Sequence, residues 1–392
     1  MKKIDNAYPT ILPIFLLIML FSCKAGDNPQ PQTPEPYSYY PPEQTGDGWE
    51  TASLQEVGMD DTLITVLVNN IRNQVYTEVH AVVIVKDGKL VFEEYFGGHD
   101  FGMGANFHGR FVQFNRDTPH NTHSTTKSFV SALVGIAIDH GFINSVDDKI
   151  FDYFTRYAYL NTGNKNNITI RHLLTMTSGF QWNEWDVSVR EAEYDMVIFN
   201  QSPDPMAYLL GKPLVAEPGT TFYYNGAGVD ALGEIIRISS GSRLDNFSEQ
   251  FLFGPLGISN YEWQTIGIHM ICGHGDVYIR PRDMAKFGYL FLRQGDWNGN
   301  RIISASWVAE STREHVPLPQ LSWVEGYGYL WWLKTYSNAG QDIDAYRTDG
   351  WGGQHIIVFS DLDMIVVFTG ANYVTEPPCD TIVNRFILPA LM

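Results

Sequence analysis

The sequence predicts a mixed α/β fold of the α+β type, in which an antiparallel sheet is built from both chain ends and flanked by helices. Two hairpin patterns, at residues 82–92 and 354–369, consist of short apolar runs separated by turn residues. A further apolar run at 328–334 predicts another strand. The segment between the two ends has helical periodicity, which predicts a mostly helical subdomain at roughly 140–320, packed beside the sheet.

The N-terminal segment predicts export from the cytoplasm. An apolar run at 11–21 follows Lys2 and Lys3; it is too short to span a bilayer and has the length of a signal-peptide core. The run ends at Leu20-Phe21-Ser22-Cys23, which resembles a bacterial lipobox. We therefore predict a lipoprotein signal peptide over 1–22 and lipidation of Cys23, which would anchor the chain in a bacterial cell envelope, on the periplasmic face or at the cell surface. The alternative is an ordinary secretory signal with an incidental cysteine.

The next segment, 23–47, is rich in proline, glutamine and threonine, which predicts an extended tether. The folded domain is expected over 48–392, beginning near Trp49 and opening with a helix at about 60–73. Later helices should each end before a glycine, which favours the left-handed conformation common after a helix. These helices are expected around 129–137, 173–174, 229–236 and 284–292, followed by Gly141, Gly179, Gly241 and Gly295.

Composition excludes some partners. The 392 residues are 44% apolar, enough for a large core, and carry a formal charge of −18. Because an acidic surface repels phosphate backbones, nucleic acid is not an expected partner. Aromatic residues make up 14% of the chain, which suits wide apolar grooves as well as core packing.

Cysteine and histidine spacings give no strong metal motif. His269-x-x-Cys272-x-His274 and His120-x-x-His123 bring possible ligands together in sequence. Neither has the separated second pair of a tetrahedral zinc site, and His-Glu-x-x-His is absent, so no metal is predicted. In an oxidising compartment, Cys272 and Cys379 could pair.

Ser124-Thr125-Thr126-Lys127 opens the helical pattern at 129–137. A serine hydroxyl is a poor nucleophile until a base lies within hydrogen-bond reach. Residues i and i+3 lie on one face of a helix, so the Lys127 amine can stand beside the Ser124 hydroxyl. Burial would lower the lysine pKa and allow the neutral amine to act as a base. By itself the spacing is also compatible with a polar helix start and a solvated lysine.

Two further runs could complete a site. The first covers residues 218–226 and reads Pro-Gly-x-x-Phe-Tyr-Tyr-Asn-Gly. It places two tyrosines on a turn, where one of them could relay a proton. The alternative is that this aromatic turn simply packs on the core. The run Gly350-Trp351-Gly352-Gly353-Gln354 leads into a strand. Its glycines allow a substrate to approach the backbone, and a free amide there could stabilise an oxyanion; a glycine-eased bend is the alternative.

Together these runs resemble the serine β-lactamase and penicillin-binding-protein superfamily in order and spacing. The similar branch is class C-like and includes family VIII carboxylesterases, nylon-oligomer hydrolases and D-amino-acid peptidases. Two secondary signatures agree, Ile170-Arg171-His172-Leu173-Leu174-Thr175-Met176-Thr177-Ser178-Gly179 and Arg282-Asp283-Met284-Ala285-Lys286-Phe287-Gly288. The resemblance runs from about Trp49 to the C-terminus and implies a β-lactamase/transpeptidase-like fold.

The resemblance also implies site roles. Ser124 would be the acylated nucleophile, Lys127 its base and Tyr224 the second proton relay. The backbone amides of Ser124 and Gln354 would form the oxyanion hole. The predicted substrate-binding residues are Trp351, Gly352, Gly353 and Asn225.

The choice of Tyr224 rests on its position six residues after the proline of the Pro-Gly pair. A strict Tyr-x-Asn count selects Tyr223 with Asn225 instead. A second Tyr-x-Asn, Tyr159-Leu160-Asn161, lacks the Pro-Gly context and is read as structural.

Two departures from the family pattern bear on substrate. Gly226 stands where the tyrosine motif usually has Asn or Ser, and Trp351-Gly352-Gly353 replaces Lys-Thr-Gly. The second change removes a cation that would hold the carboxylate of a β-lactam or peptide terminus; Arg347 could replace it or could be a surface charge.

We therefore expect a serine hydrolase that acts through an acyl-enzyme on a small-molecule carboxylic ester or small amide, with no cofactor. The alternatives are a β-lactamase or D-amino-acid peptidase acting on cell-wall-type substrates, and a non-catalytic binding or sensor protein. The loop 101–119 is expected to edge the groove and shape specificity.

Overall fold

The computed structural model describes residues 36–185, 187–267 and 270–391. The predicted signal peptide, Cys23 and the first part of the predicted tether lie outside the described residues. No helix in the described part of the chain has both the length and the apolarity needed to cross a membrane.

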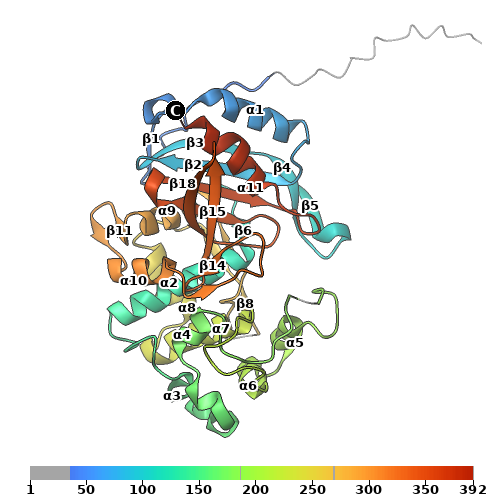
Figure 1. Ribbon diagram of the computed structural model, residues 1–392, viewed down its shortest axis with the longest axis vertical. Helices are drawn as coiled ribbons and strands as arrows, with labels where there is room; N and C mark the ends of the chain where they lie inside the picture. The colour runs from blue at the N-terminus through green and yellow to red at the C-terminus, as the bar shows by residue number, and fades with distance from the viewer. Residues whose placement is uncertain (1–35, 186, 268–269, 392) are drawn as a thin grey trace, which may run out of the picture. The chain divides into compact units, whose positions relative to one another are not determined.

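The main sheet joins the two ends of the chain, as predicted (Figure 1). Its nine strands have the order β1-β3-β2-β18-β17-β16-β15-β14-β13. The strands are antiparallel except for the β1–β3 pair, and Ile84 on β2 lies opposite Val366 on β18. The strands are β1 (Glu50–Thr51), β2 (Val79–Lys86), β3 (Lys89–Tyr95), β13 (Val316–Pro317), β14 (Gly326–Tyr327), β15 (Trp332–Asn338), β16 (Gln341–Arg347), β17 (His355–Phe359) and β18 (Met364–Gly370).

Both predicted hairpins are confirmed. β2 and β3 are joined by Asp87 and Gly88, whose φ angles of 53° and 77° match the positive values that two-residue hairpin turns require. β17 and β18 are joined through Ser360–Leu362 and Asp363. The third predicted strand, 328–334, was placed too early. Residues 328–331 instead form a connection. Leu330 has a φ of 61°, and the N–H of Leu330 donates to the carbonyl of Leu174, so β15 begins only at Trp332.

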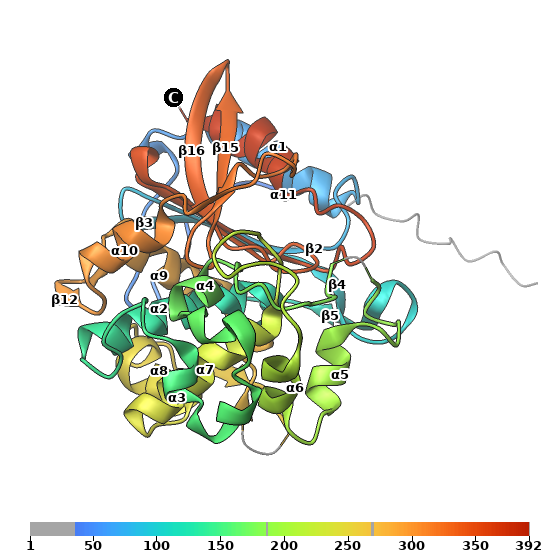
Figure 2. The same cartoon turned by 60° about the horizontal axis from the view of Figure 1, so that its bottom comes forward.

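Helices cover both faces of the main sheet (Figure 2), and alternating residues of β2 pack on the two layers. Val82 and Ile84 belong to the cluster formed with α1 (Asp61–Arg72) and the C-terminal residues that follow α11 (Cys379–Ile382). Val83 and Val85 belong to the larger cluster formed with α2 (Thr126–Asp139) and α9 (Pro281–Leu292). A strand side chain points to one face or the other in turn, so this pattern explains why β2 is buried on both faces.

The predicted helices are present, but two of the predicted glycine stops are wrong. The helix at 170–174 ends with Thr175 as its C-cap, before Gly179, and α9 ends with Arg293 as its C-cap, before Gly295. Gly141 and Gly241 follow α2 and α7 (Gly226–Ser240) with φ angles of 74° each, the left-handed conformation expected after a helix. The remaining helices are α3 (Ile150–Tyr153), α4 (Ile170–Leu174), α5 (Asp195–Gln201), α6 (Pro205–Gly211), α8 (Leu244–Ser248) and α10 (Ala305–Thr312). The remaining strands are β4 (Gly97–Phe101), β5 (His108–Gln113), β6 (His120–Asn121), β7 (Tyr261–Trp263), β8 (Thr265–Ile266), β9 (Met270–Ile271), β10 (Val277–Ile279), β11 (Asp296–Trp297) and β12 (Asn300–Arg301).

The folded unit begins at Tyr37 rather than near Trp49. Tyr37 is buried, and its N–H donates to Asn69 Oδ1 at 3.1 Å. The Tyr39 hydroxyl donates to the carbonyl of Val91 at 2.8 Å. The described part of the predicted tether, residues 36–47, forms no helix or strand, and Tyr37 and Tyr39 attach it to the domain.

Candidate active site

Ser124 lies in a short 3₁₀ turn, His123–Thr125, directly before α2. His123 has a φ of 45°, which is unusual for a residue other than glycine, and its N–H donates to Asn121 Oδ1 at 2.8 Å. The hydroxyl of Thr122 donates to the carbonyl of Val277 on β10 at 2.9 Å. The small sheet that contains β6 and β10 therefore holds the backbone at the point where it turns into α2.

Lys127 lies beside Ser124, at the distance that proton transfer requires. Its Nζ is 2.8 Å from Ser124 Oγ and 2.6 Å from the carbonyl oxygen of His274. Only 2% of Lys127 is exposed, and burial lowers the pKa of its amine, while the carboxylates of Glu184 and Asp230 act in the opposite direction. The structure thus brings together the serine and lysine that the sequence singled out.

Tyr224, and not Tyr223, adjoins this pair. The ring centroid of Tyr224 is 4.9 Å from Lys127 Nζ. Burial and the charge of Glu184 raise the pKa of the Tyr224 hydroxyl well above its ordinary value, and a hydrogen bond with Ser124 acts in the opposite direction. Tyr223 is 36% exposed, and its N–H donates to the carbonyl of Met176. Tyr159 is exposed as well.

Asn225 has a helix-capping contact in the structure. Its Oδ1 accepts a hydrogen bond from the N–H of Gly228 at 3.0 Å, which makes it the N-cap of α7. The side chain is buried and its Nδ2 has no hydrogen-bond partner among the described residues, so its role in substrate binding stays a prediction.

The glycine-rich turn over 350–354 packs against the residues that precede Ser124. A Cβ added to Gly350 would lie 2.3 Å from the carbonyl oxygen of Thr122, so only glycine fits there. The Thr125 hydroxyl donates to the carbonyl of Gln354 at 2.8 Å. The N–H of Gln354, predicted to face the oxyanion, donates to the carbonyl of Gly350 at 3.0 Å. In this structure that amide is therefore engaged within the turn.

One group of aromatic side chains adjoins His123, the neighbour of Ser124 in the chain, and a second group adjoins Tyr224. Trp351 lies 5.9 Å from the ring of His123, and its other aromatic neighbours are Phe101, Phe107 and Tyr373. Because Phe101 and Phe107 come from the loop 101–119, that loop contacts Trp351, one of the predicted substrate-binding residues. In the second group, Trp185 stacks on Tyr224 at 5.1 Å with an angle of 9° between the rings, and Trp332 stacks beside both.

Sequence reasoning missed Glu184. Its Oε2 accepts hydrogen bonds from the N–H of Gly226 at 2.7 Å and from Trp182 Nε1 at 2.8 Å. A Cβ on Gly226 would lie 3.1 Å from both carboxylate oxygens, so the glycine makes room for this acidic group beside Lys127. The unusual glycine was the only signal in the sequence; nothing around Glu184 resembles a motif.

Arg347 is neither a surface charge nor available to a substrate carboxylate. It is buried, with Nη1 2.5 Å from Asp380 Oδ1 and Nη2 2.7 Å from Asp349 Oδ2. Both acidic partners explain why its pKa lies above the ordinary value despite burial.

The two described cysteines, Cys272 and Cys379, are both buried and free rather than paired. Cys272 and His274 form a group with Asp230 whose ligating atoms all lie within 4.8 Å of one another, whereas His269 lies outside the described residues. The hydrogen-bonding capacity of Asp230 is already used, because its carboxylate accepts from the N–H groups of Gly273 and His274 and lies 2.8 Å from His274 Nδ1. This group fixes the His274 carbonyl that contacts Lys127. In the other motif considered, His120-x-x-His123, the His120 ring contacts His80 at 2.7 Å.

Comparison with known proteins identifies the family. The sequence model of the Beta-lactamase family matches residues 69–390. The chain belongs to the β-lactamase family. This β-lactamase-family chain is 24% identical over 306 residues to an uncharacterised protein of Alkalihalophilus pseudofirmus, a match that covers 73% of this chain and 80% of the relative.

Solved structures of other proteins share the fold. A family VIII carboxylesterase has a TM-score of 0.63 and 18% identity, over 84% of this chain and 95% of that one. A penicillin-binding protein from Bacillus halodurans has a TM-score of 0.62 and 18% identity, over 82% of this chain and 98% of that one. The resemblance and the β-lactamase/transpeptidase-like fold inferred from the sequence are thus confirmed, and the chain is a hydrolase of this fold.

Proposed function

We propose that this protein is a serine hydrolase that cleaves a carboxylic ester or a small amide through an acyl-enzyme. The observation that supports this most is the 2.8 Å separation of Lys127 Nζ and Ser124 Oγ, with the lysine buried and its pKa lowered. A neutral amine at that distance can take the hydroxyl proton as the serine attacks.

The proposed reaction begins when Ser124 Oγ attacks the substrate carbonyl and its proton passes to Lys127. Tyr224 then relays a proton to the leaving alcohol or amine, and the C–O or C–N bond breaks to leave the acyl-enzyme. Water adds to the acyl group and gives a proton to Lys127. Lys127 then passes this proton to Ser124 Oγ as the bond between the acyl carbon and Oγ breaks, which releases the acid and free Ser124. The Ser124 N–H has no acceptor within the described residues and would donate to the oxyanion. The Gln354 N–H would join it only after leaving the carbonyl of Gly350.

The surroundings favour an uncharged, apolar substrate. Trp351 lies beside His123 and Trp185 beside Tyr224, and aromatic surfaces bind apolar groups and exclude water. Arg347, the cation considered for a substrate carboxylate, is held by two acidic side chains. These contacts support an ester substrate over a β-lactam or a D-peptide, as does the structural likeness to a family VIII carboxylesterase.

Covalent labelling tests the proposal directly. A fluorophosphonate probe should add one mass increment to the chain, and p-nitrophenyl esters should be hydrolysed. Both should be lost in Ser124→Ala and kept in Ser306→Ala, an exposed serine outside the site. Ester turnover that persists in Ser124→Ala would contradict the proposal. Neither label nor turnover in the parent chain, across esters, linear amides, D-peptides and cephalosporins, would favour the non-catalytic alternative.

We also propose that the chain is exported and anchored through lipid on Cys23. The support is the short apolar run that stops at this cysteine. Metabolic labelling with a radioactive or alkyne fatty acid should mark the parent chain and not Cys23→Ser. Equal labelling of both chains would contradict the proposal.

A further inference from the structure

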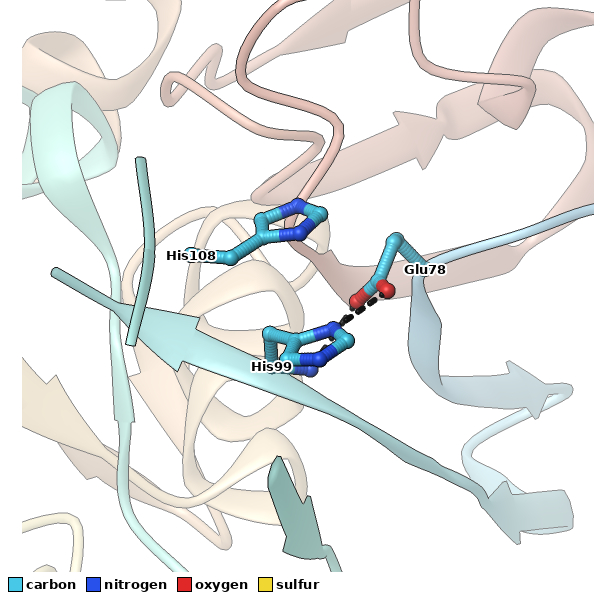
Figure 3. A group of neighbouring side chains, drawn as sticks. All are labelled: Glu78, His99 and His108. Atoms are coloured by element: carbon cyan, nitrogen blue, oxygen red, sulfur yellow. Dashed lines mark hydrogen bonds and ion pairs between the residues drawn. The ribbon is translucent and has the colours of Figure 1, made fainter. Parts of the chain in front are cut away.

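A second cluster of chemically reactive side chains lies apart from the proposed catalytic residues, where the β4–β5 hairpin meets the start of β2. Glu78 directly precedes β2, His99 belongs to β4 and His108 begins β5 (Figure 3). One ligating atom of each residue lies within 4.8 Å of those of the other two. Figure 3 shows the Glu78 carboxylate beside the two stacked imidazole rings, in contact with His99. Two imidazoles and one carboxylate form a donor set that divalent transition metals favour.

The structure fixes the carboxylate in place. Glu78 Oε1 lies 2.8 Å from His99 Nδ1, and Oε2 accepts from the His99 N–H at 2.9 Å and contacts His80 Nε2 at 3.1 Å. His80 is fully buried, and its other ring nitrogen contacts His120 at 2.7 Å. Such an outer partner orients a carboxylate for metal binding.

The backbone at Glu78 is also unusual. Its φ of 53° lies in the left-handed region, which a residue with a long side chain rarely adopts. The surrounding structure holds it there, because the carbonyl of Glu78 accepts from the N–H of Ala371 at 3.0 Å and from Asn372 Nδ2 at 3.2 Å. This conformation places the carboxylate against the β4–β5 hairpin.

We infer that Glu78, His99 and His108 form a binding site for one divalent transition-metal ion, with Zn²⁺ as the cation whose preferences they fit. A zinc ion bonds to imidazole nitrogen and carboxylate oxygen at about 2.0–2.2 Å, so its ligand atoms lie about 3.3 Å apart. The Glu78 and His99 atoms are already that close. The ion would take the place of the proton on His99 Nδ1, and that proton would move to Nε2 of the same ring.

His108 must move for the site to close. Its ring now stacks on the ring of His99, with centroids 4.6 Å apart and planes 3° apart, and its Nε2 contacts the carbonyl of Ala371 at 3.0 Å. Stacked rings cannot both point a nitrogen at one ion, so the His108 ring turns out of the stack when the metal binds. The side chains of His99 and Glu78 are 37% and 18% exposed, which gives the ion a path from solvent and leaves the fourth position to water.

The site would stabilise the region beside Ser124 without taking part in the reaction. Asn372 follows Ala371, and its N–H donates to the carbonyl of Gly352 in the glycine-rich turn. The hairpin that carries His99 and His108 also carries Phe101 and Phe107, which pack on Trp351. An ion at the base of the hairpin would therefore hold this aromatic group in place.

The test measures metal binding to the full chain, independently of catalysis. The starting protein carries Cys272→Ser, because Cys272 and His274 form the other group of possible ligands. After treatment with EDTA and dialysis, Zn²⁺ is titrated against a chelating dye. We expect one Zn²⁺ per chain, at least about hundredfold weaker affinity in Glu78→Gln and in the His99→Ala/His108→Ala double variant, and parent affinity in His140→Ala, an exposed histidine. Far-ultraviolet circular dichroism checks that each variant is folded.

Two outcomes would overturn the inference: no stoichiometric Zn²⁺ binding by the Cys272→Ser chain, or unchanged affinity in both cluster variants. If the double variant fails to fold, Glu78→Gln decides alone, because it keeps the size of the side chain and one oxygen that accepts from the His99 N–H. Zn²⁺ should also raise the midpoint of thermal unfolding of the Cys272→Ser chain and leave that of Glu78→Gln unchanged. The result stands apart from the proposed function, since Ser124→Ala should bind Zn²⁺ like its parent.

Discussion

At the residue scale, the proposed chemistry depends on how far burial suppresses the charge of Lys127. Replacing Lys127 by Ala removes the base, and kcat/KM for a p-nitrophenyl ester should fall by at least about a hundredfold. Lys127→Arg should not restore it, because a guanidinium stays charged. In the parent chain the rate should rise with pH through the lowered pKa of Lys127, since only the neutral amine accepts a proton. Turnover like that of the parent in Lys127→Ala would contradict the mechanism.

Glu184 gives a second prediction, because its charge raises the pKa of Lys127. Glu184→Gln keeps the shape of the side chain and removes that charge, so the pKa of Lys127 should fall further. The acid limb of the kcat/KM profile should therefore move to lower pH. Glu193→Gln, an exposed acidic residue from the same connection, serves as the control and should leave the limb in place. A shift to higher pH in Glu184→Gln would show that the carboxylate does not act on Lys127 in this way.

The two adjacent tyrosines form a matched pair for testing the proton relay. Tyr224→Phe removes the hydroxyl next to Ser124 and should lower kcat by about 10²–10⁴-fold. Tyr223→Phe removes a hydroxyl from a side chain that is 36% exposed and should change kcat little. Steady-state kinetics on one ester distinguish them. A larger loss in Tyr223→Phe would favour the Tyr-x-Asn alignment over the one that counts from the proline.

At the element scale, α2 carries Lys127 in its first turn, directly after the 3₁₀ turn that holds Ser124, and depends on close packing further along. A Cβ on Gly135 would lie 2.4 Å from Trp307 Cγ on α10. Gly135→Ala should therefore lower the free energy of unfolding by about 1–3 kcal/mol, measured by urea denaturation. Gly211→Ala, in α6, meets only Leu160 Cδ2 at 4.0 Å and should leave stability equal or slightly higher. Equal stability of both variants would show that α10 moves aside without cost.

The elements explain how much the sequence could predict. Turn residues and apolar periodicity are local signals, so the Asp87-Gly88 hairpin, α2 and α7 were predicted near their observed positions. The Ser124–Lys127 contact was predictable as well, because one helical turn sets it. Contacts between distant segments have no local signal. Glu184 reaches Gly226 across 42 residues, and Glu78 meets His99 and His108 only once β2, β4 and β5 are assembled.

At the scale of the whole molecule, residues 37–47 test where the domain begins. Arg282 on α9 joins three parts of the chain, because its guanidinium contacts Asp47 at 3.0 Å, Glu93 on β3 at 2.6 Å and the carbonyl of Glu43 at 2.9 Å. Proline-rich composition could not show this contact, because the partner arginine is more than 230 residues away.

Two truncated chains should therefore differ in their free energy of unfolding. Deleting 2–35 should leave the free energy of unfolding unchanged. Deleting 2–47 removes the buried Tyr37 and also Asp47, one of the two acidic partners of Arg282. Burying one aromatic side chain contributes about 1.5–3 kcal/mol, and a hydrogen bond to a charged group about 1.5–3 kcal/mol, so the longer deletion should cost at least about 3 kcal/mol in urea denaturation. Equal stability of the two chains would show that the domain begins at residue 48, as the sequence predicts, and that residues 37–47 do not contribute to its stability.

The pH dependence of the stability difference between the two truncations shows how much of it comes from the ion pair of Asp47 and Arg282. Burial raises the pKa of Asp47, but its contacts with Arg282 outweigh this and hold the pKa below the ordinary value. A carboxyl whose pKa is lower in the folded state stabilises the fold above its unfolded pKa, and loses that contribution as the pH falls through the folded value. The gap between the two truncations should therefore be larger at pH 7 than below the ordinary pKa of an aspartate. A gap that stays constant with pH would assign it to Tyr37 and the other apolar contacts, with no contribution from Asp47.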